Sequence, residues 1–186
     1  MNHSKKKIIA IIGSATEDSS NLKIAEQIAV TFENFDMQII KDLHRYPHFE
    51  TKFAFQNIPD EILQIREQMN SADGILFCTP EYIFSIPSGL KNILEWCVST
   101  VIFTDKPVSI ITASASGKKG HEELNMILKM LGAITADNNN VLLNGIKSRF
   151  DEKGQIDEQT LAQIINTIKN FEATVDAAIH KRVNTI

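Results

Sequence analysis

Short apolar runs alternate along this sequence with segments whose apolar residues recur at helical spacing, and that alternation limits the folds open to the chain. Apolar runs of this length are typical of buried strands. They cover Ile8–Ile12, Met37–Ile40, Gly74–Cys78, Val108–Thr112 and the stretch from Ile134 to Leu143. The last run is interrupted by Asn138-Asn139-Asn140, which predicts a turn or a bulge.

Helical spacing follows each of these runs. Apolar residues three and four apart begin near Leu22, Pro59 and Pro87, and continue over 122–131 and 157–182. Proline is favoured at a helix start, and Gly132 stands where the helix over 122–131 would end. Five strands alternating with five helices predict an α/β fold whose parallel sheet is covered by helices on both faces.

Length and composition favour one globular domain. The 186 residues are 43% hydrophobic and carry a formal net charge of −4, with no linker or repeat, so residues 1–186 are expected to form a single domain. Charged residues of both signs are interspersed along the chain, and the negative net charge predicts no nucleic-acid partner. The apolar run after the basic tail Lys5-Lys6-Lys7 is too short for a signal peptide or a membrane span, so we expect a cytoplasmic protein without a membrane partner.

The cysteine and histidine residues do not indicate a redox site or a metal site. Cys78 and Cys97 lie in apolar sequence without Cys-x-x-Cys spacing, which is typical of small buried hydrophobic residues. His44 and His48 are spaced like a metal pair on a helix, but Pro47 lies between them and no set of partner ligands accompanies them. We therefore expect no metal site.

The first candidate site is the loop Gly13–Asn21. In an open α/β sheet, ligands bind beyond the carboxyl ends of the strands, and this loop joins the first strand to the first helix. It is rich in hydroxyl groups, and the helix start presents free N–H groups and partial positive charge, as a phosphate site requires. An alternative needs no ligand, because Asp18, Ser19 or Ser20 could simply cap the helix.

The second candidate site is the loop from Thr79 to Pro87, after the third strand. Two prolines restrict its backbone, and Tyr82, Ile83 and Phe84 offer apolar and aromatic surface on which a flat ring could stack. The alternative is that these side chains pack in the core. The loop Ala113–Gly120, after the fourth strand, should lie beside it.

Together these loops resemble the NADPH-dependent FMN reductase family, which includes quinone, azo-dye and chromate reductases. The resemblance is carried by Gly13-Ser14, Ser19 and Asn21, and most specifically by Pro80-Glu81-Tyr82, Ser85, Pro87, Leu90-Lys91-Asn92 and Trp96. It implies a flavodoxin-like three-layer sandwich with strand order 2-1-3-4-5, an FMN cofactor, NADPH or NADH as reductant, a small-molecule electron acceptor and a homodimer or homotetramer.

The same resemblance implies which residues bind the cofactor. The FMN phosphate would lie against Ser14, Thr16, Ser19, Ser20 and Asn21, the ring along Pro80, Glu81, Tyr82, Ile83 and Phe84, and Ser114, Ala115, Ser116 and Gly117 would close the other side. No side-chain acid or base is required, because the flavin carries the chemistry, so no catalytic residue is assigned.

The sequence departs from the family pattern in the phosphate loop. The family usually has Arg at the position of Thr16, and Glu17 and Asp18 make this loop acidic instead. Carboxylates repel a phosphate dianion, so we expect FMN to bind more weakly than is typical of the family. Ile83 also replaces the family's Asn. Two alternatives stay open: a flavodoxin-like electron carrier, and a scaffold that has lost its flavin.

Overall fold

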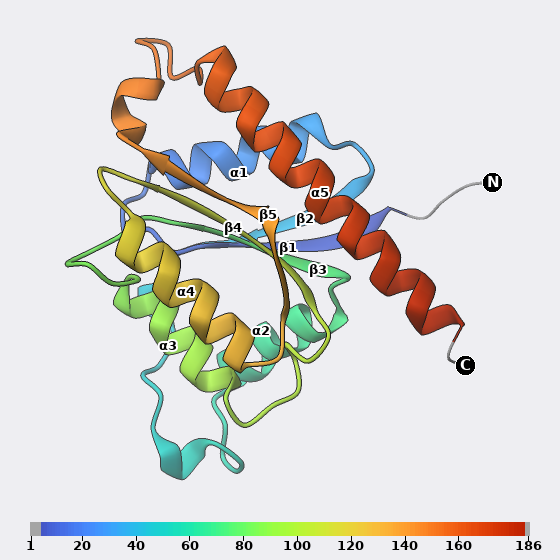
Figure 1. Cartoon of the computed structure of the whole chain (residues 1–186). Helices are drawn as coiled ribbons and strands as arrows, with labels where there is room; N and C mark the ends of the chain where they lie inside the picture. Colours follow the sequence, from blue (N-terminus) through green and yellow to red (C-terminus); the bar gives the residue numbers. More distant parts are fainter. Residues whose placement is uncertain (1–4, 185–186) are drawn as a thin grey trace.

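The computed structural model describes residues 5–184, and residues 1–4 and 185–186 lie outside the described residues. Of the predicted basic tail Lys5-Lys6-Lys7, Lys6 and Lys7 belong to the first strand. Five strands form one parallel sheet in the order β2-β1-β3-β4-β5 (Figure 1). The predicted flavodoxin-like order is therefore confirmed. The strands are β1 (Lys6–Ile12), β2 (Phe35–Ile40), β3 (Gly74–Thr79), β4 (Pro107–Ser114) and β5 (Ile134–Asn144).

Helices cover both faces of the sheet, as the alternation predicted. The helices are α1 (Ser20–Thr31), α2 (Asp60–Ser71), α3 (Ser88–Cys97), α4 (Lys118–Met130) and α5 (Glu158–Val183). Helices α1 and α5 pack on one face, and α2, α3 and α4 on the other. Among the described helices, none combines the length and the apolar character needed to cross a membrane.

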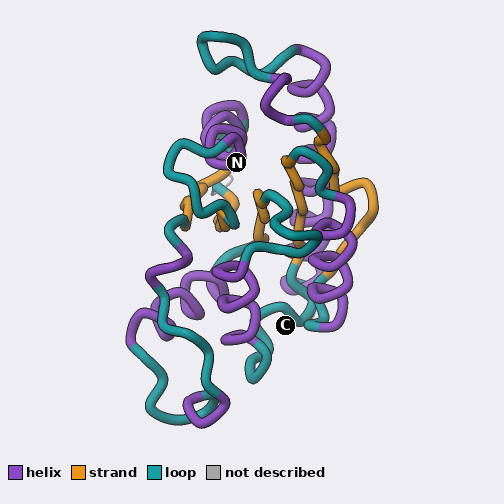
Figure 2. The backbone as a smooth tube through the Cα atoms, turned by 90° about the vertical axis from the view of Figure 1, so that its left-hand side faces the viewer, coloured by secondary structure: helices purple, strands orange, loops and turns teal. Residues whose placement is uncertain are grey.

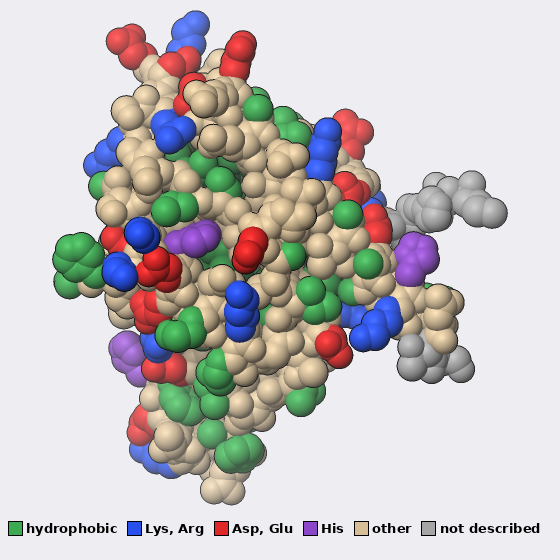
Figure 3. Space-filling model, in the orientation of Figure 1, with side chains coloured by type: hydrophobic (Ala, Val, Ile, Leu, Met, Phe, Trp, Pro, Cys, Tyr) green, Lys and Arg blue, Asp and Glu red, His purple; other side chains and the backbone are tan. Residues whose placement is uncertain are grey.

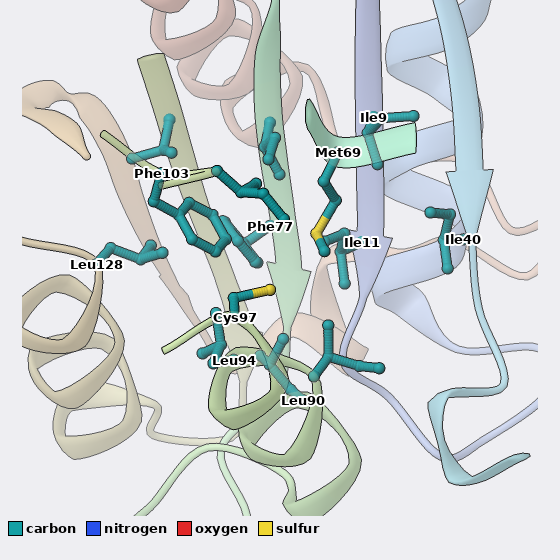
Figure 4. Close-up of a cluster of buried hydrophobic side chains, with 14 of the residues drawn as sticks. Ile9, Ile11, Ile40, Met69, Phe77, Leu90, Leu94, Cys97, Phe103 and Leu128 are labelled. Atoms are coloured by element: carbon teal, nitrogen blue, oxygen red, sulfur yellow. The ribbon is translucent and has the colours of Figure 1, made fainter. Parts of the chain in front are cut away.

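Alternation within each inner strand supplies a separate core to each face. In β1, Ile9 and Ile11 join the core under α2, α3 and α4, whereas Ile8, Ala10 and Ile12 join the core under α1 and α5. Figure 4 shows the first core, where Phe77 of β3 meets side chains from several helices. Strands buried on both faces read as unbroken apolar runs, which explains the pattern in the sequence.

Three predicted helix boundaries agree with the structure and one does not. Helices α2 and α3 begin directly after Pro59 and Pro87. Gly132, at φ +88°, follows the end of α4, and the N–H groups of Gly132 and Ala133 donate to Lys129 and Leu128. Helix α4, however, begins at Lys118, four residues before the predicted start. A carboxylate of another loop supplies an acceptor to its first turn, as described below.

The asparagine run in β5 forms the predicted irregularity. Pairing with β4 passes from Val108 and Thr135 to Ile110 and Asn140, so the intervening residues of β5 bulge opposite Ser109. Ser109 Oγ donates to the Asn139 carbonyl (2.5 Å), and the Asn140 side chain accepts from Ile110 N–H (2.9 Å). The bulge shortens the effective length of β5, so both strands still end at the same edge.

Both cysteines are buried and free, as the sequence predicted. Burial raises the pKa of both thiols. Each therefore behaves as a small apolar side chain in its core.

Candidate functional site

A pocket of about 560 Å³ opens at the carboxyl ends of β1, β3 and β4. This volume lies within the usual range for small-molecule sites. Figure 2 looks onto this edge of the sheet, with the strands seen nearly end-on behind the loops. Ten of the fourteen predicted site residues line the pocket: Ser14, Thr16, Ser19, Ser20, Asn21, Pro80, Glu81, Tyr82, Ser114 and Ala115.

The loop after β1 approaches β3 closely because residue 13 is glycine. A Cβ atom at Gly13 would lie 2.2 Å from Thr79 Oγ1 and 2.8 Å from Thr79 Cβ. The Thr79 side chain is fully buried, and its Oγ1 donates to the Pro80 carbonyl (3.1 Å). Gly13 therefore lets the ends of β1 and β3 converge under the pocket.

Ser19 caps helix α1. Its Oγ accepts from the N–H of Leu22 (3.1 Å), so of the three capping candidates in the sequence Ser19 is the one used. Ser14 Oγ likewise accepts from the N–H of Thr16 (3.2 Å) and shapes the loop. Other first-turn N–H groups of α1 have no partner within the helix, and they carry the positive end of its dipole. Capping and anion binding are thus compatible at this helix end.

Asn21 lines the pocket and has one buried side-chain acceptor without a partner. The side chain is only 3% exposed, and its Nδ2 donates to the Ala113 carbonyl (3.1 Å). Its Oδ1 is buried and has no hydrogen-bond partner. A buried polar atom without a partner is costly, and the Asn125 Oδ1, away from the pocket, is unpaired in the same way.

The loop after β3 ends in a tight hairpin. Tyr82 and Ser85 exchange two backbone hydrogen bonds (2.9 and 3.1 Å) around Ile83 and Phe84, which both have positive φ (50° and 58°). Turns of this type favour Asn and Gly, and β-branched and aromatic residues are strained there. Ile83 and Phe84 are 95% and 77% exposed and lie outside the pocket lining. Tyr82 faces the pocket, with its hydroxyl 3.4 Å from Ser14 Oγ.

Two carboxylates tie this hairpin to α4. Glu81 Oε2 accepts from the N–H of Gly120 (2.8 Å) in the first turn of α4. Glu123 Oε2 accepts from Ser85 Oγ (2.6 Å) and from the N–H of Ile86 (3.0 Å). Partial burial raises the pKa of Glu123, but these two hydrogen bonds and the nearby charge of Lys91 outweigh that effect, so its pKa lies below the ordinary value.

Glu81 therefore explains the early start of α4, because its carboxylate satisfies an N–H group of the first turn. Gly117 precedes that turn at φ +85°, and a Cβ there would lie 2.8 Å from Leu142. Ser116 and Gly117 do not line the pocket, whereas Ser114 and Ala115 do.

The motif residues on α3 serve the fold. Asn92 accepts from the N–H of Phe49 (2.8 Å) and donates to the Pro47 carbonyl (3.0 Å). Trp96 Nε1 donates to the same carbonyl (2.7 Å). These bonds hold the irregular segment between β2 and α2, which extends below the sheet in Figures 1 and 2. Neither side chain reaches the pocket.

The sequence reasoning missed one wall of the pocket. The loop after β5 contributes Gly145, Ile146, Lys147 and Ser148, and Asp18 and Ala113 complete the lining. The sequence predicts a site built from the loops after the first, third and fourth strands, because sheet order places the switch point between the first and third strands. A fifth strand beside the fourth brings its own loop to the same edge, and that adjacency was the available signal.

The arrangement can hold a molecule with an anionic end and a flat end. The start of α1 suits the anion, and Pro80, Glu81 and Tyr82 offer a partly apolar wall. Within residues 5–184, no group of three His, Cys, Asp or Glu side chains is placed to hold a metal ion. The pocket lining combines hydroxyl, amide, aromatic and backbone groups with the charged side chains Asp18, Glu81 and Lys147.

Comparisons with known proteins agree with this geometry. The sequence profile described as NADPH-dependent FMN reductase matches residues 6–147. A relative in Vibrio ruber, NADH:(hydroxy)cinnamate reductase subunit CrdA, is 30% identical over 88% of this chain and 84% of its own. A quinone reductase of Escherichia coli strain K12 is 25% identical over 90% of this chain and 94% of its own.

Solved structures share the fold. The flavoenzyme NAD(P)H:(acceptor) oxidoreductase FerB of Paracoccus denitrificans superposes with a TM-score of 0.68 over 94% of this chain and 98% of its own, at 19% identity. An apo form of the NADH:FMN oxidoreductase EMOB gives a TM-score of 0.70 over 91% of this chain and 90% of its own, at 17% identity. The family, the enzyme class and the flavodoxin-like fold predicted from the sequence are confirmed. This chain belongs to the NADPH-dependent FMN reductase family, and it is an oxidoreductase of the kind that works with FMN and NAD(P)H.

Proposed function

We propose that this protein holds FMN in the pocket at the ends of β1, β3 and β4, and passes electrons from NAD(P)H to a quinone, an azo compound, free flavin or a similar acceptor. The observation that carries the proposal is the pocket of about 560 Å³, with its lining of hydroxyl groups, Asn21 and the loop after β3. It lies beside the start of α1 and opposite the hairpin loop, which is where a phosphate and a ring would be held.

The phosphate end would be bound by the N–H groups that begin α1 and by Ser14, Thr16, Ser19 and Ser20. Ser19 Oγ and Ser14 Oγ already accept backbone hydrogen bonds, and each hydroxyl keeps its own proton to donate. Asp18 also lines the pocket, which supports our expectation of weaker FMN affinity than is usual in the family.

The ring end would lie along Pro80, Glu81 and Tyr82, with Ser114 and Ala115 on the other side. Because Glu81 and Glu123 fix this loop to α4, the wall against the ring is held in place before a ligand arrives. Ile83 and Phe84, also proposed for the cofactor, project beyond the pocket and would meet a second substrate or a neighbouring subunit instead.

When bound, FMN supplies the redox chemistry, accepting a hydride from NAD(P)H and passing electrons to the acceptor. The protein's contribution is to orient the ring, to bury one of its faces and to leave the other face open to the two substrates in turn. We propose a ping-pong cycle on this basis, because one open face accommodates one substrate at a time.

Steady-state oxidation of NAD(P)H tests this function. With added FMN and a quinone, we expect turnover, and double-reciprocal plots at several fixed quinone concentrations should be parallel. An absence of turnover with quinone, azo and free-flavin acceptors would contradict the proposed function. Intersecting lines would contradict the ping-pong cycle alone.

The relatives differ in the acceptors that their names state. They include a cinnamate reductase, an NADPH azoreductase and quinone reductases, so the proposal for this chain is kept at the level of small-molecule electron acceptors. The choice between NADH and NADPH is likewise left to the assay, since relatives of both kinds occur.

We also propose a homodimer or homotetramer. The exposed hairpin tip Ile83-Phe84 and the exposed Met126 and Met130 of α4 are large apolar side chains of the kind that interfaces cover. Figure 3 shows hydrophobic side chains projecting at the edge where the hairpin loop lies in Figure 1. Light scattering coupled to size-exclusion chromatography measures the assembly.

A single domain over 1–186 and a cytoplasmic location stay predictions, which limited proteolysis and cell fractionation test.

A further inference from the structure

The loop after β5 brings a cation to a pocket whose phosphate loop has none. Gly13–Asn21 contains no Lys or Arg. Among the lining residues in the described part of the chain, Lys147 alone carries a positive charge. Asp18 lines the same pocket, so without Lys147 the charge at this edge would be purely negative.

The backbone at Lys147 is held firmly. Gly145 adopts a left-handed conformation (φ +62°) and begins a short 3-10 helix, Ile146–Arg149. The N–H of Gly145 donates to the Ala115 carbonyl (3.2 Å), which ties this loop to the loop after β4. Ile146 is 5% exposed and packs in the core under α1 and α5. Lys147 therefore lies on a loop whose backbone is fixed by this hydrogen bond and by the packing of Ile146.

The Lys147 side chain is not used within the protein. Arg149, two residues further on, donates from Nε to the Asn144 carbonyl (2.8 Å) and from Nη1 to Thr160 Oγ1 (2.8 Å), so its guanidinium is engaged in holding the loop. In contrast, Lys147 makes no hydrogen bond or ion pair with any other residue between 5 and 184. An exposed, unpaired ammonium at the rim of a pocket is available to an anion.

We propose that Lys147 binds the phosphate of FMN and takes the place of the arginine that the phosphate loop lacks. This inference rests on the proposed function, because it requires FMN in this pocket. A consequence is selectivity: Lys147 favours FMN over riboflavin, since the two flavins differ only by the phosphate group.

Flavin titrations of Lys147→Met test the proposal. The variant keeps the length of the aliphatic chain and removes the charge. Monitored by flavin fluorescence, the dissociation constant for FMN should rise about fivefold to tenfold, and that for riboflavin should stay unchanged. The salt dependence of FMN binding should also become shallower in the variant, because one ionic contact is gone.

Lys153→Met is the matched control, because Lys153 is an exposed lysine of the next turn that does not line the pocket. It should leave both dissociation constants unchanged, and Lys147→Arg should retain FMN affinity. Equal FMN affinity in wild type and Lys147→Met would overturn the inference and leave the proposed function intact. Equal losses for FMN and riboflavin would also overturn it, since they would indicate a disturbed ring or ribityl site. If the wild type binds neither flavin, the proposed function itself fails.

Discussion

At the scale of single residues, the site depends on Gly13 and Asn21, whose buried surroundings restrict which side chain can stand at each position. Gly13 has no room for a side chain beside Thr79. Asn21 holds the start of α1 onto the Ala113 carbonyl of β4 with one end of its amide and leaves the other end unpaired. Both residues join the first loop to the centre of the sheet, so both affect stability and binding together.

Gly13→Ala should destabilise the protein by about 2–3 kcal/mol, because the added Cβ would overlap the buried Thr79 side chain. Urea unfolding measures the change. Gly89→Ala is the control: its Cβ would lie 3.1 Å from Leu43 and inside a helix, where alanine is favoured over glycine by about 1 kcal/mol, so a near-neutral result is expected. Equal effects at both positions would contradict the account of Gly13.

At the scale of elements, helix α4 acts as the support of the hairpin loop. Its first turn is capped by Glu81, and its Glu123 holds Ser85 and Ile86. His121, on the same turn, lies against β4, with Nδ1 2.8 Å from Thr112 Oγ1. The loop and the helix therefore form one unit, and charge changes on α4 should be felt in the loop.

Glu123→Gln should lower the free energy of unfolding at neutral pH by about 1–2 kcal/mol, because charge-assisted hydrogen bonds from the hairpin are replaced by neutral ones. Since the pKa of Glu123 is lowered in the folded state, its contribution is present above pH 4.5 and is lost as pH falls through the folded value. The unfolding curves of wild type and variant should converge in acid. Glu122→Gln is the control, because Glu122 pairs with Lys119 at the surface and has no hydrogen bond to the hairpin.

His121 should make a second contribution to the pH dependence of stability. Burial lowers the pKa of His121, and Glu122 only partly offsets it, so the unfolded chain binds this proton more tightly than the folded protein does. Stability should therefore fall as pH drops below 6.5 towards the folded pKa. The slope between pH 6.5 and 5, measured by thermal unfolding, should be shallower in His121→Gln. An identical slope would show that His121 does not contribute.

At the scale of the whole molecule, much of the architecture could be predicted from the sequence, because strands buried on both faces and amphipathic helices leave clear periodic patterns. The start of α4 could not, since its first turn reads Lys118-Lys119-Gly120 and is stabilised by Glu81 from a distant loop. The exposure of Ile83 and Phe84 was also hidden, because an apolar pair in sequence is usually packed.

The candidate site was predictable in part for a related reason. Loops that follow strands at the switch point carry recognisable residues, and most of those line the pocket. Lys147 could not be recognised from the sequence, because its position in the pocket depends on the bulge in β5 and on the hydrogen bond from Gly145 to Ala115. Tertiary arrangement, and not local pattern, brings it beside the phosphate loop.

Titration of the purified, flavin-stripped protein with FMN tests the central claim most directly. The account predicts saturable binding of one FMN per chain, with a dissociation constant of about 0.1–10 μM that reflects the acidic phosphate loop. A low-nanomolar constant would contradict the predicted weakness of the phosphate site. The absence of saturable binding would contradict the assignment of this pocket to FMN.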